Sequence, residues 1–382
     1  MAFAEPLPES VGPLAEPETG GTLTIDLDAL EANWRTLAQK LITAECAAVV
    51  KANAYGLGLE PVTAKLVKAG CKTFFVADIA EARRVRARAR EATIYVLNGF
   101  VPEAEMAFAE LNAQPVINST AELAEWDAFV AAQNWRGGAA IHVDTGMNRL
   151  GISADEAAAL ALRVQSENHG ITLLMSHLAC AEIADHPLNA SQIRLFRELR
   201  MLYHGVPASL ANSSGIFLGN TAHFDMARPG AALYGINPTP GRANPMRGAV
   251  ELAGRILQVR QVQQGETVGY GAAWKAKRAS RIAVVALGYA DGLLRAASGT
   301  DRKGGGAAIV AAKRCPIAGH ISMDLVCVDI TDLTDVRVRR GDSATFIGEN
   351  ISVDEVAASA GTIGYEILVR LGLRCHLVYR GG

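Results

Sequence analysis

The sequence predicts an α/β protein with an N-terminal (β/α)8 barrel, of the TIM type, followed by a mainly β C-terminal domain. Short apolar runs alternate with helix-like segments through the first part of the chain. Continuous apolar strands separated by helices are typical of a parallel sheet that is covered on both faces. Pro and Gly then cluster at 235–248, as in a linker. Beyond this linker the runs are β-branched and separated by turns, which favours antiparallel strands.

The barrel is predicted from the number of apolar runs that follow a first amphipathic helix. That helix places five apolar side chains on one face, namely Leu27, Leu30, Trp34, Leu37 and Leu41. The runs then lie near 47–52, 73–77, 93–98, 114–118, 139–143, 172–177, 208–212 and 229–234. Eight strands favour a closed barrel over an open doubly wound sheet.

The second domain is predicted from shorter runs at 254–262, 281–289, 307–314, 324–330 and 374–380, with one helix near 353–361. We therefore expect a flexible tail over 1–21, a cofactor-binding barrel over 22–245 and a mainly β domain over 246–382. The first twenty residues hold Pro, Glu and Gly, with no basic cluster followed by an apolar run, so no secretory signal is expected.

Composition excludes several classes of function. Half of the 382 residues are apolar and the formal net charge is −2, so neither nucleic acid nor a membrane surface is an expected partner. No run approaches eighteen apolar residues, so no transmembrane helix is expected. Six scattered cysteines without C-x-x-C spacing suit core positions in a reducing compartment. Cys180 and His186 have no further ligands around them, so we assign no metal.

Lys51 interrupts an apolar run at the end of the first predicted barrel strand. Function in a parallel barrel gathers at the carboxyl ends of the strands. A lone lysine there is by default a surface anchor or a residue whose charged end reaches solvent. Burial can also keep such an amine neutral, which makes it a nucleophile towards an aldehyde.

Polar residues also stand at other strand ends. They are Arg149 after "VDTG", His177 in "MSHL", Asn212 and Ser213 before a probable helix start, and Arg228 two residues before Gly230. A helix start suits an anion, and a glycine allows close backbone approach. An amine, a hydroxyl at a helix start and two arginines on one barrel face suggest a phosphorylated aldehyde cofactor.

The motifs "VVKANAYGLG", "VDTGMNRLG", "SHLACAE", "ANSSG", "RPGAALYG", "VGYGAAW", "GYADG", "GHISMD" and "GYEILVR" occur in this order. In this order and spacing they resemble the alanine racemases from about residue 22 to the C-terminus. The resemblance implies pyridoxal 5'-phosphate as cofactor, L- and D-alanine as substrates, and a homodimer with shared active sites. It also implies a bacterial enzyme that supplies D-alanine for cell-wall peptidoglycan, and we expect it in the cytoplasm.

The resemblance also implies a role for each matched residue. Lys51 forms the aldimine with the cofactor and is one catalytic base, and Tyr270, from the partner subunit, is the other. Tyr55, Ser213, Gly230, Ala231 and Tyr365 hold the phosphate, with Asn212 beside them, while His177 packs on the pyridine ring and Arg228 donates to its nitrogen. Arg149 contacts the cofactor and the substrate carboxylate, Met323 offers its backbone N–H to that carboxylate, Asp324 belongs to the same loop and Tyr289 lines the entrance.

Racemisation needs two bases because Cα must lose a proton on one face and gain one on the other. Lysine and tyrosine ordinarily titrate near pH 10, so both must be tuned to act near neutral pH. Arg228 cannot accept a proton, so the pyridine nitrogen stays unprotonated. The carbanion is then less delocalised, which should limit transamination and decarboxylation.

One position departs from the family pattern. The residue before "VDTG" is often a lysine that carries a carbamate and orients the arginine of that motif, whereas here it is His142. A histidine does not supply such a stable anion. We hypothesise that a bound chloride, or another carboxylate, takes that place near Arg149.

Four alternatives remain. A decarboxylase of basic amino acids on the same architecture would present a carboxylate to the ring nitrogen, where this chain offers Arg228. A single-barrel protein that binds the cofactor would lack the second domain and Tyr270. An aldolase could use Lys51 without a cofactor and would not be yellow. Serine could replace alanine, because a methyl-sized pocket discriminates weakly against one hydroxyl.

Overall fold

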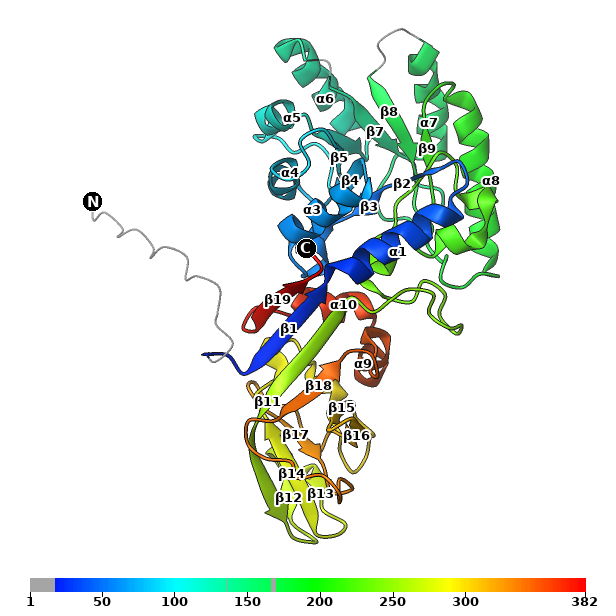
Figure 1. Cartoon of the computed structure of the whole chain (residues 1–382). Helices are drawn as coiled ribbons and strands as arrows, with labels where there is room; N and C mark the ends of the chain where they lie inside the picture. The colour runs from blue at the N-terminus through cyan, green and yellow to red at the C-terminus, as the bar shows by residue number, and fades with distance from the viewer. Residues whose placement is uncertain (1–17, 136, 166–169) are drawn as a thin grey trace, which may run out of the picture. The chain divides into compact units, whose positions relative to one another are not determined.

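The computed structural model describes residues 18–135, 137–165 and 170–382 (Figure 1). The predicted tail over 1–21 therefore lies largely outside the described residues. The chain divides into two compact units. We call Leu27–Arg247 the barrel unit, and Gly248–Gly381 with the described residues up to Asp26 the β unit.

The barrel unit is built on a parallel sheet of short strands. In the described residues its path runs through β2 (Glu45–Cys46), β10 (Met226–Ala227), β9 (Ala208–Ser209), β8 (Ile171–Met175), β7 (Ala139–His142), β6 (Gln114–Ile117), β5 (Thr93–Val96), β4 (Thr73–Val76) and β3 (Ala48–Val49). The path begins with β2 and ends with β3, and these two short strands are successive parts of one extended stretch, 45–49. That stretch bonds to β4 on one side and to 225–229 on the other, so the sheet closes on itself. The predicted barrel is confirmed.

Helices alternate with these strands and cover the outside of the barrel (Figure 1). They are α1 (Leu27–Lys40), α3 (Leu59–Ala69), α4 (Ile79–Arg86), α5 (Glu105–Leu111), α6 (Thr120–Gln133), α7 (Ala154–Leu160) and α8 (Pro187–Leu202). The short α2 (Lys51–Tyr55) is instead a single turn with left-handed backbone angles. Several begin where the sequence supplies a capping side chain: Asp78, Ser119 and Ser153 each accept the backbone N–H three residues on. The strand ends of the barrel are thereby connected to fixed helix starts.

The prediction of a barrel strand at the last apolar run, 229–234, was wrong. The strand β10 ends at Ala227, and Ala231–Tyr234 forms a 3₁₀ turn, η5. Pairing continues only as far as the Pro229 carbonyl, which accepts the N–H of Val49. The run reads as a strand because its side chains are buried, and burial alone does not distinguish a core strand from a buried turn.

The β unit holds a largely antiparallel sheet, which confirms the predicted mainly β domain. Its strands are β1 (Gly21–Asp26), β11 (Val250–Val262), β14 (Ser280–Val285), β15 (Ala307–Val310), β16 (Lys313–Pro316), β17 (Val326–Asp329), β18 (Ser343–Ile347) and β19 (His376–Arg380), with the hairpin β12 (Thr267–Val268) and β13 (Trp274–Lys275) beside them. Two helices follow β18, namely α9 (Val353–Ala360), which was predicted, and α10 (Gly364–Arg370), which was not.

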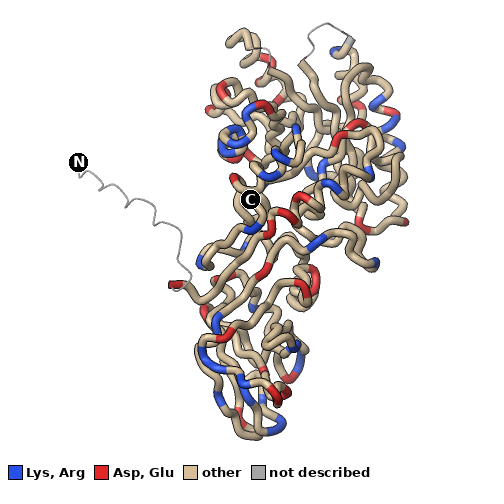
Figure 2. The backbone as a smooth tube through the Cα atoms, viewed as in Figure 1, with Lys and Arg blue, Asp and Glu red and all other residues tan. Residues whose placement is uncertain are grey.

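The strand β1 lies early in the chain but belongs to the β unit. It pairs antiparallel with β11 and parallel with β19. Lys and Arg are interspersed with Asp and Glu over both units (Figure 2), and their numbers, 37 and 39, nearly balance. Among the described residues, none of the helices combines the length and the apolar character that crossing a bilayer would need.

Candidate active site

Lys51 begins α2, two residues after the end of strand β3. The four residues that follow, Ala52 to Tyr55, all have φ between 53° and 56°. The left-handed conformation costs a residue with a side chain roughly 1–2 kcal/mol. Backbone bonds from Ala54 to the Val50 carbonyl and from Gly56 to the Ala52 carbonyl, both 2.8 Å, close this left-handed turn. The strained turn fixes the direction in which Lys51 leaves the strand.

Glu81 holds the left-handed turn from the neighbouring helix α4. One carboxylate oxygen of Glu81 accepts the N–H of Asn53 at 2.9 Å, and the other accepts the N–H of Ala77 at the same distance. The side-chain oxygen of Asn53 in turn accepts the N–H of Leu59 and an N–H of Arg84. Each polar group of the strained segment named here has a partner, so the strain is stabilised by hydrogen bonds.

The Lys51 amine is partly buried, and burial together with the Arg149 charge lowers its pKa, while Glu81 opposes that effect. A lowered pKa leaves more of the amine unprotonated near neutral pH. An unprotonated amine at a strand end is a nucleophile for a carbonyl carbon and a base for a proton.

Arg228 is buried at the end of β10. Its guanidinium donates to the Ser209 hydroxyl and to the Ser176 carbonyl, both at 2.5 Å. Burial lowers the pKa of Arg228 to about 9, which still leaves it a cation at neutral pH. Burial first, and then the Arg228 charge, hold the pKa of His177 well below its ordinary value. The site therefore pairs a fixed cation with a neutral imidazole.

Ser213, Gly230 and Tyr55 form a tightly closed corner next to the left-handed turn. The Ser213 hydroxyl accepts the backbone N–H groups of Gly230 and Ala232, at 3.0 and 3.2 Å. A Cβ on Gly230 would lie 2.3 Å from the Tyr55 hydroxyl. The Tyr55 ring also stacks on Tyr234, with centroids 4.5 Å apart. A larger residue would displace the Tyr55 hydroxyl, so glycine keeps backbone and hydroxyl groups close enough together to hold an anion such as phosphate.

Asn212 precedes this corner, and its side-chain oxygen accepts the N–H of Gly215 at 2.8 Å. It therefore starts the 3₁₀ turn η3 (Gly215–Leu218), which the sequence analysis expected as a helix. Ala231 begins η5 and is buried. The predicted barrel residues thus stand at the ends of strands of one closed barrel.

Arg149 is exposed in a turn after β7. Asp144 closes this turn by accepting the N–H groups of Gly146 and Met147 at 2.8 and 2.9 Å. His142, at the end of β7, is buried. It lies 2.8 Å from the side-chain oxygen of Asn118, measured from Nδ1.

Asn118 fixes the tautomer of His142. The Asn118 amide nitrogen donates to the Val116 carbonyl at 2.7 Å, so its oxygen faces His142 and accepts a hydrogen bond from the N–H at Nδ1. Burial first, and then Arg228 and Arg149, lower the pKa of His142 to about 4. A neutral imidazole, and not an anion, therefore stands at this position.

Four of the five predicted residues of the β unit lie on loops, and the fifth, Tyr365, lies in a helix. Tyr270 is in the 3₁₀ turn η6 (Tyr270–Ala272) of the β12–β13 hairpin and is 71% exposed. Tyr289 begins η7 (Tyr289–Asp291) and donates its N–H to the Ser322 carbonyl at 3.0 Å. Met323 and Asp324 follow directly after Ser322.

Three loops of the β unit are neighbours. A Cβ on Gly319 would lie 2.6 Å from the Val268 carbonyl oxygen, so the 319–324 loop contacts the start of the Tyr270 turn. Tyr365 lies in α10. The last turn of α10 contacts Gly292, since a Cβ on Gly292 would lie 2.8 Å from the Arg370 carbonyl oxygen. The structure thus gathers the predicted residues into two groups, one in each unit.

Sequence reasoning missed Glu81, Asn53 and Tyr234. Glu81 was detectable, because Asp78 and Glu81 follow the pattern of a helix N-cap with an acid three residues on. Asn53 had no such signal, since its role depends on a left-handed backbone.

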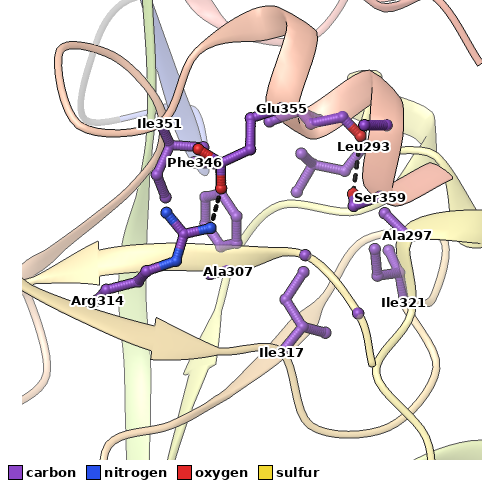
Figure 3. Close-up of a pocket in the computed structure, with 14 residues that line it drawn as sticks. Leu293, Ala297, Ala307, Arg314, Ile317, Ile321, Phe346, Ile351, Glu355 and Ser359 are labelled. Atoms are coloured by element: carbon purple, nitrogen blue, oxygen red, sulfur yellow. Dashed lines mark hydrogen bonds and ion pairs between the residues drawn. The ribbon is translucent and has the colours of Figure 1, made fainter. Parts of the chain in front are cut away.

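A separate cavity of about 250 Å³ lies within the β unit (Figure 3). It is lined mainly by apolar side chains such as Leu293, Ile321 and Phe346, and Arg314 pairs with Glu355 beside it. The predicted site residues do not line it. In the part of the chain that the structure describes, no three His, Cys, Asp or Glu side chains are grouped to hold a metal ion.

A lysine at the end of a closed parallel barrel, beside a buried arginine and a neutral histidine, defines a class of barrel protein that can hold a carbonyl compound by an imine bond. Two family models match the chain: "Alanine racemase, N-terminal domain" over residues 25–238 and "Alanine racemase, C-terminal domain" over residues 249–379. The chain belongs to the alanine racemase family, as its motifs predicted.

Individual relatives agree with the family models. The alanine racemase of Methylobacterium sp. (strain 4-46) is 51% identical over 360 residues, which cover 94% of this chain and 98% of the relative. A catabolic alanine racemase of Mesorhizobium japonicum is 46% identical over 372 residues, which cover 97% of this chain and 96% of the relative. The crystal structure of alanine racemase from Bartonella henselae, with covalently bound pyridoxal phosphate, superposes with a TM-score of 0.88 at 39% identity. The match covers 94% of this chain and 99% of the chain in that structure.

Proposed function

We propose that this chain interconverts L-alanine and D-alanine with pyridoxal phosphate as its cofactor. The observation that carries the proposal is the Lys51 amine, whose pKa is lowered at the end of a barrel strand, in a chain of the alanine racemase family. The related structure from Bartonella henselae holds pyridoxal phosphate covalently. Lys51 is the amine that would form the corresponding bond here.

The barrel residues fit a phosphorylated pyridine aldehyde. The glycine-lined corner of Ser213, Gly230 and Tyr55 would hold the phosphate, together with Ala231, Asn212 and Tyr365. His177 would pack on the ring, and the buried Arg228 would donate to the ring nitrogen. When bound, pyridoxal phosphate withdraws electrons from the amino acid and so acidifies its Cα–H bond.

The chain's own residues then move the proton. Lys51, once substrate has replaced it at the cofactor, exchanges a proton with Cα on one face, because its lowered pKa keeps the amine available as a base. Tyr270 exchanges a proton on the opposite face. Arg228 keeps a positive charge where other enzymes place a carboxylate, and so favours return of the proton to Cα over other fates of the carbanion.

The substrate carboxylate is proposed to meet Arg149 and the backbone N–H of Met323, with Tyr289 and Asp324 near the entrance. The neutral His142 does not balance the Arg149 charge. We therefore keep the proposal of a chloride ion, or another carboxylate, beside Arg149.

We propose that the active unit is a homodimer, in which Tyr270 serves the barrel of the second copy. Tyr270 is 71% exposed and Met323 53% exposed in the single chain. Exposed apolar side chains on neighbouring loops support a surface that another chain covers. Supply of D-alanine to peptidoglycan in the cytoplasm is the cellular role we expect.

Tyr270→Phe tests the two-base assignment. The variant and the wild type, loaded with pyridoxal phosphate, are incubated in D₂O with L-alanine or with D-alanine. The wild type should racemise both and exchange the Cα proton of both. The variant should stay yellow, lose racemisation and exchange the Cα proton of one enantiomer only.

Tyr379→Phe, which changes a tyrosine of the same unit outside the proposed site, is the matched control and should behave as the wild type. Unimpaired racemisation by Tyr270→Phe would refute its role as a base. A colourless wild-type protein that cleaves aldols would favour the aldolase alternative. A faster reaction with serine than with alanine would change the substrate.

A further inference from the structure

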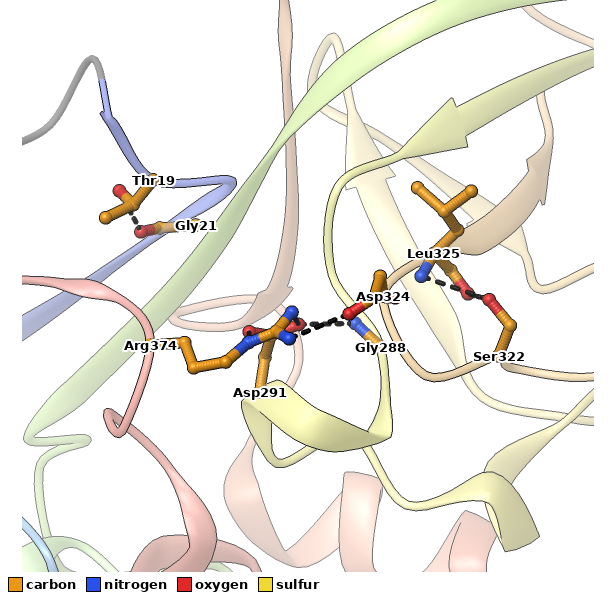
Figure 4. Close-up of polar contacts among 8 residues, drawn as sticks. All are labelled: Thr19, Gly21, Gly288, Asp291, Ser322, Asp324, Leu325 and Arg374. Atoms are coloured by element: carbon orange, nitrogen blue, oxygen red, sulfur yellow. Dashed lines mark hydrogen bonds and ion pairs between the residues drawn. The ribbon is translucent and has the colours of Figure 1, made fainter.

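Arg374 binds two carboxylates that come from two different loops of the β unit (Figure 4). Its Nε lies 3.0 Å from one oxygen of Asp291, and its Nη2 lies 3.3 Å from the other. Its Nη1 lies 2.7 Å from an oxygen of Asp324. Asp291 lies in the turn 288–292, here called the Tyr289 turn, and Asp324 ends the loop 319–324, here called the Met323 loop.

The two loops are already close through their backbones. The N–H of Ala290 donates to the Met323 carbonyl at 3.1 Å, beside the bond from Tyr289 to Ser322. A Cβ on Gly288 would lie 2.2 Å from the Met323 carbonyl oxygen. Contact this close excludes a side chain at Gly288, and the same carbonyl faces the Tyr289 turn.

Asp291 joins the backbone contact to the arginine. It is buried, and one of its oxygens accepts the N–H of Gly288 at 2.8 Å while both face Arg374. Asp324 is more than half exposed, and Arg374 is about half exposed. Arg374 thus extends from a buried, fixed carboxylate to an exposed one at the end of the Met323 loop.

We infer that Arg374 is a positioning residue, which holds the Met323 loop against the Tyr289 turn and so fixes the direction of the Met323 N–H. This inference rests on the proposed function, in which that N–H receives the substrate carboxylate. A planar guanidinium can satisfy two carboxylates at once with divergent N–H groups, whereas an ammonium acts as a single point charge. The pKa of Arg374 is raised by hydrogen bonds to Asp291 and Asp324, in keeping with both contacts.

If Arg374 only stabilised the fold, its loss would raise hydrogen exchange across the whole β unit and leave KM unchanged. The positioning role predicts another result. The contact with Asp324 is exposed and adds little to stability. The contact with Asp291 is buried on the carboxylate side, so loss of Arg374 also lowers stability, but Asp291 keeps the N–H of Gly288 as a donor and the fold should persist. Loss of a charge-assisted hydrogen bond that aims a ligand-binding group weakens binding by about tenfold. The effect should therefore fall on binding of the carboxylate.

The experiment compares the dimeric holoenzyme of the wild type with Arg374→Gln, Arg374→Lys and Asp324→Asn. The control is Arg339→Gln, which changes an exposed arginine paired with Asp342 in the same unit. Measurements are KM and kcat for L-alanine, inhibition by propionate as a carboxylate without an amine, and hydrogen exchange of peptides that cover 286–293 and 319–326.

Arg374→Gln should raise KM and the propionate inhibition constant about tenfold, with kcat changed less than about twofold. Arg374→Lys should fall between this variant and the wild type. The Tyr289 turn and the Met323 loop should exchange faster in Arg374→Gln than in Arg339→Gln. Asp324→Asn tests the same contact should Arg374→Gln fail to fold, and should give the same pattern.

Unchanged KM, propionate inhibition and loop exchange in a folded Arg374→Gln protein would overturn the inference. A fall in kcat alone, or a general rise in exchange across the β unit, would also overturn it. A wild type that does not racemise alanine would refute the proposed function. Hydrogen exchange of the two loops would still decide whether Arg374 holds them together.

Discussion

The guanidinium of Arg228 lies 3.4 Å from Nδ1 of His177. The arginine belongs to the end of β10 and the histidine follows β8, so two strand ends of the barrel bring them together. A cation this close disfavours a second positive charge. His177 is thus neutral, and its Nδ1 accepts a hydrogen bond from the Arg228 guanidinium.

Replacing Arg228 should raise the pKa of His177. In Arg228→Gln the Arg228 charge is gone while burial, the larger cause, remains. We therefore expect the pKa of His177 to rise but to stay below its ordinary value of 6.5. NMR titration of ring-labelled histidine measures it, with Arg35→Gln, an exposed arginine of α1, as control. No change in the His177 titration would contradict the assignment.

Acid should destabilise the protein through His142. Its folded pKa is about 4 against 6.5, so below pH 6.5 the unfolded chain binds a proton that the folded chain does not. Stability is therefore lost as the pH falls from 6.5 towards 4. Between pH 7 and pH 5 this one group contributes about 2 kcal/mol of that loss.

His142→Gln should remove that part of the pH dependence, because glutamine does not titrate. Urea unfolding at pH 7 and pH 5 measures the free energy of unfolding in each protein. His204→Gln, at an exposed histidine, is the control. If His142→Gln loses as much stability as the wild type between these pH values, the buried neutral imidazole is not the cause.

Removal of Glu81 should affect both stability and Lys51. Glu81→Ala leaves the N–H groups of Asn53 and Ala77 without their acceptor, which costs about 2 kcal/mol or more of unfolding free energy. The left-handed turn should loosen, so Lys51 should react more slowly with pyridoxal phosphate. Thermal unfolding and the rate at which the yellow colour appears measure the two effects.

Glu122 provides the control for Glu81. It occupies the same third position of its helix, and it accepts the N–H groups of Phe100 and Asn118 from two neighbouring loops. Glu122→Ala should cost similar stability and leave the reaction of Lys51 unchanged. Equal slowing in both variants would mean that the turn does not depend on Glu81.

Gly230→Ala should destabilise the barrel by about 1–3 kcal/mol, because the new methyl group would overlap the Tyr55 hydroxyl. Tyr55→Phe removes that hydroxyl and should recover part of the loss in the double variant. A double-mutant cycle of unfolding free energies should show favourable coupling of about 1 kcal/mol. Additive effects would show that the ring of Tyr55 moves away freely.

The alternation of apolar runs and helices was sufficient to predict the barrel, because a parallel strand is buried on both faces and its sequence shows it. The same signal failed at 229–234, where a turn is equally buried. The pairing of β1 with β11 and β19 could not be predicted, since hydrophobic pattern does not specify a partner more than 200 residues away.

The sequence best predicted the positions of those candidate residues that follow apolar runs. Lys51, Arg228 and His177 stand at strand ends, which the pattern of runs locates. Glu81 and Arg374 act by connecting loops that are distant in sequence, and such contacts depend on the folded chain. The tautomer of His142 likewise depends on Asn118, which belongs to another strand end.

The pairing of β1 with β19 joins almost the first described residues to almost the last. During synthesis β1 leaves the ribosome early, whereas β19 is made only after the whole barrel unit and the other strands of the β unit. The β unit can therefore be completed only once His376–Arg380 has been made, while the barrel unit can begin to fold beforehand. A chain that stops short of His376 would leave one edge of β1 bare and open to pairing with other molecules, which makes premature termination a direct route to aggregation.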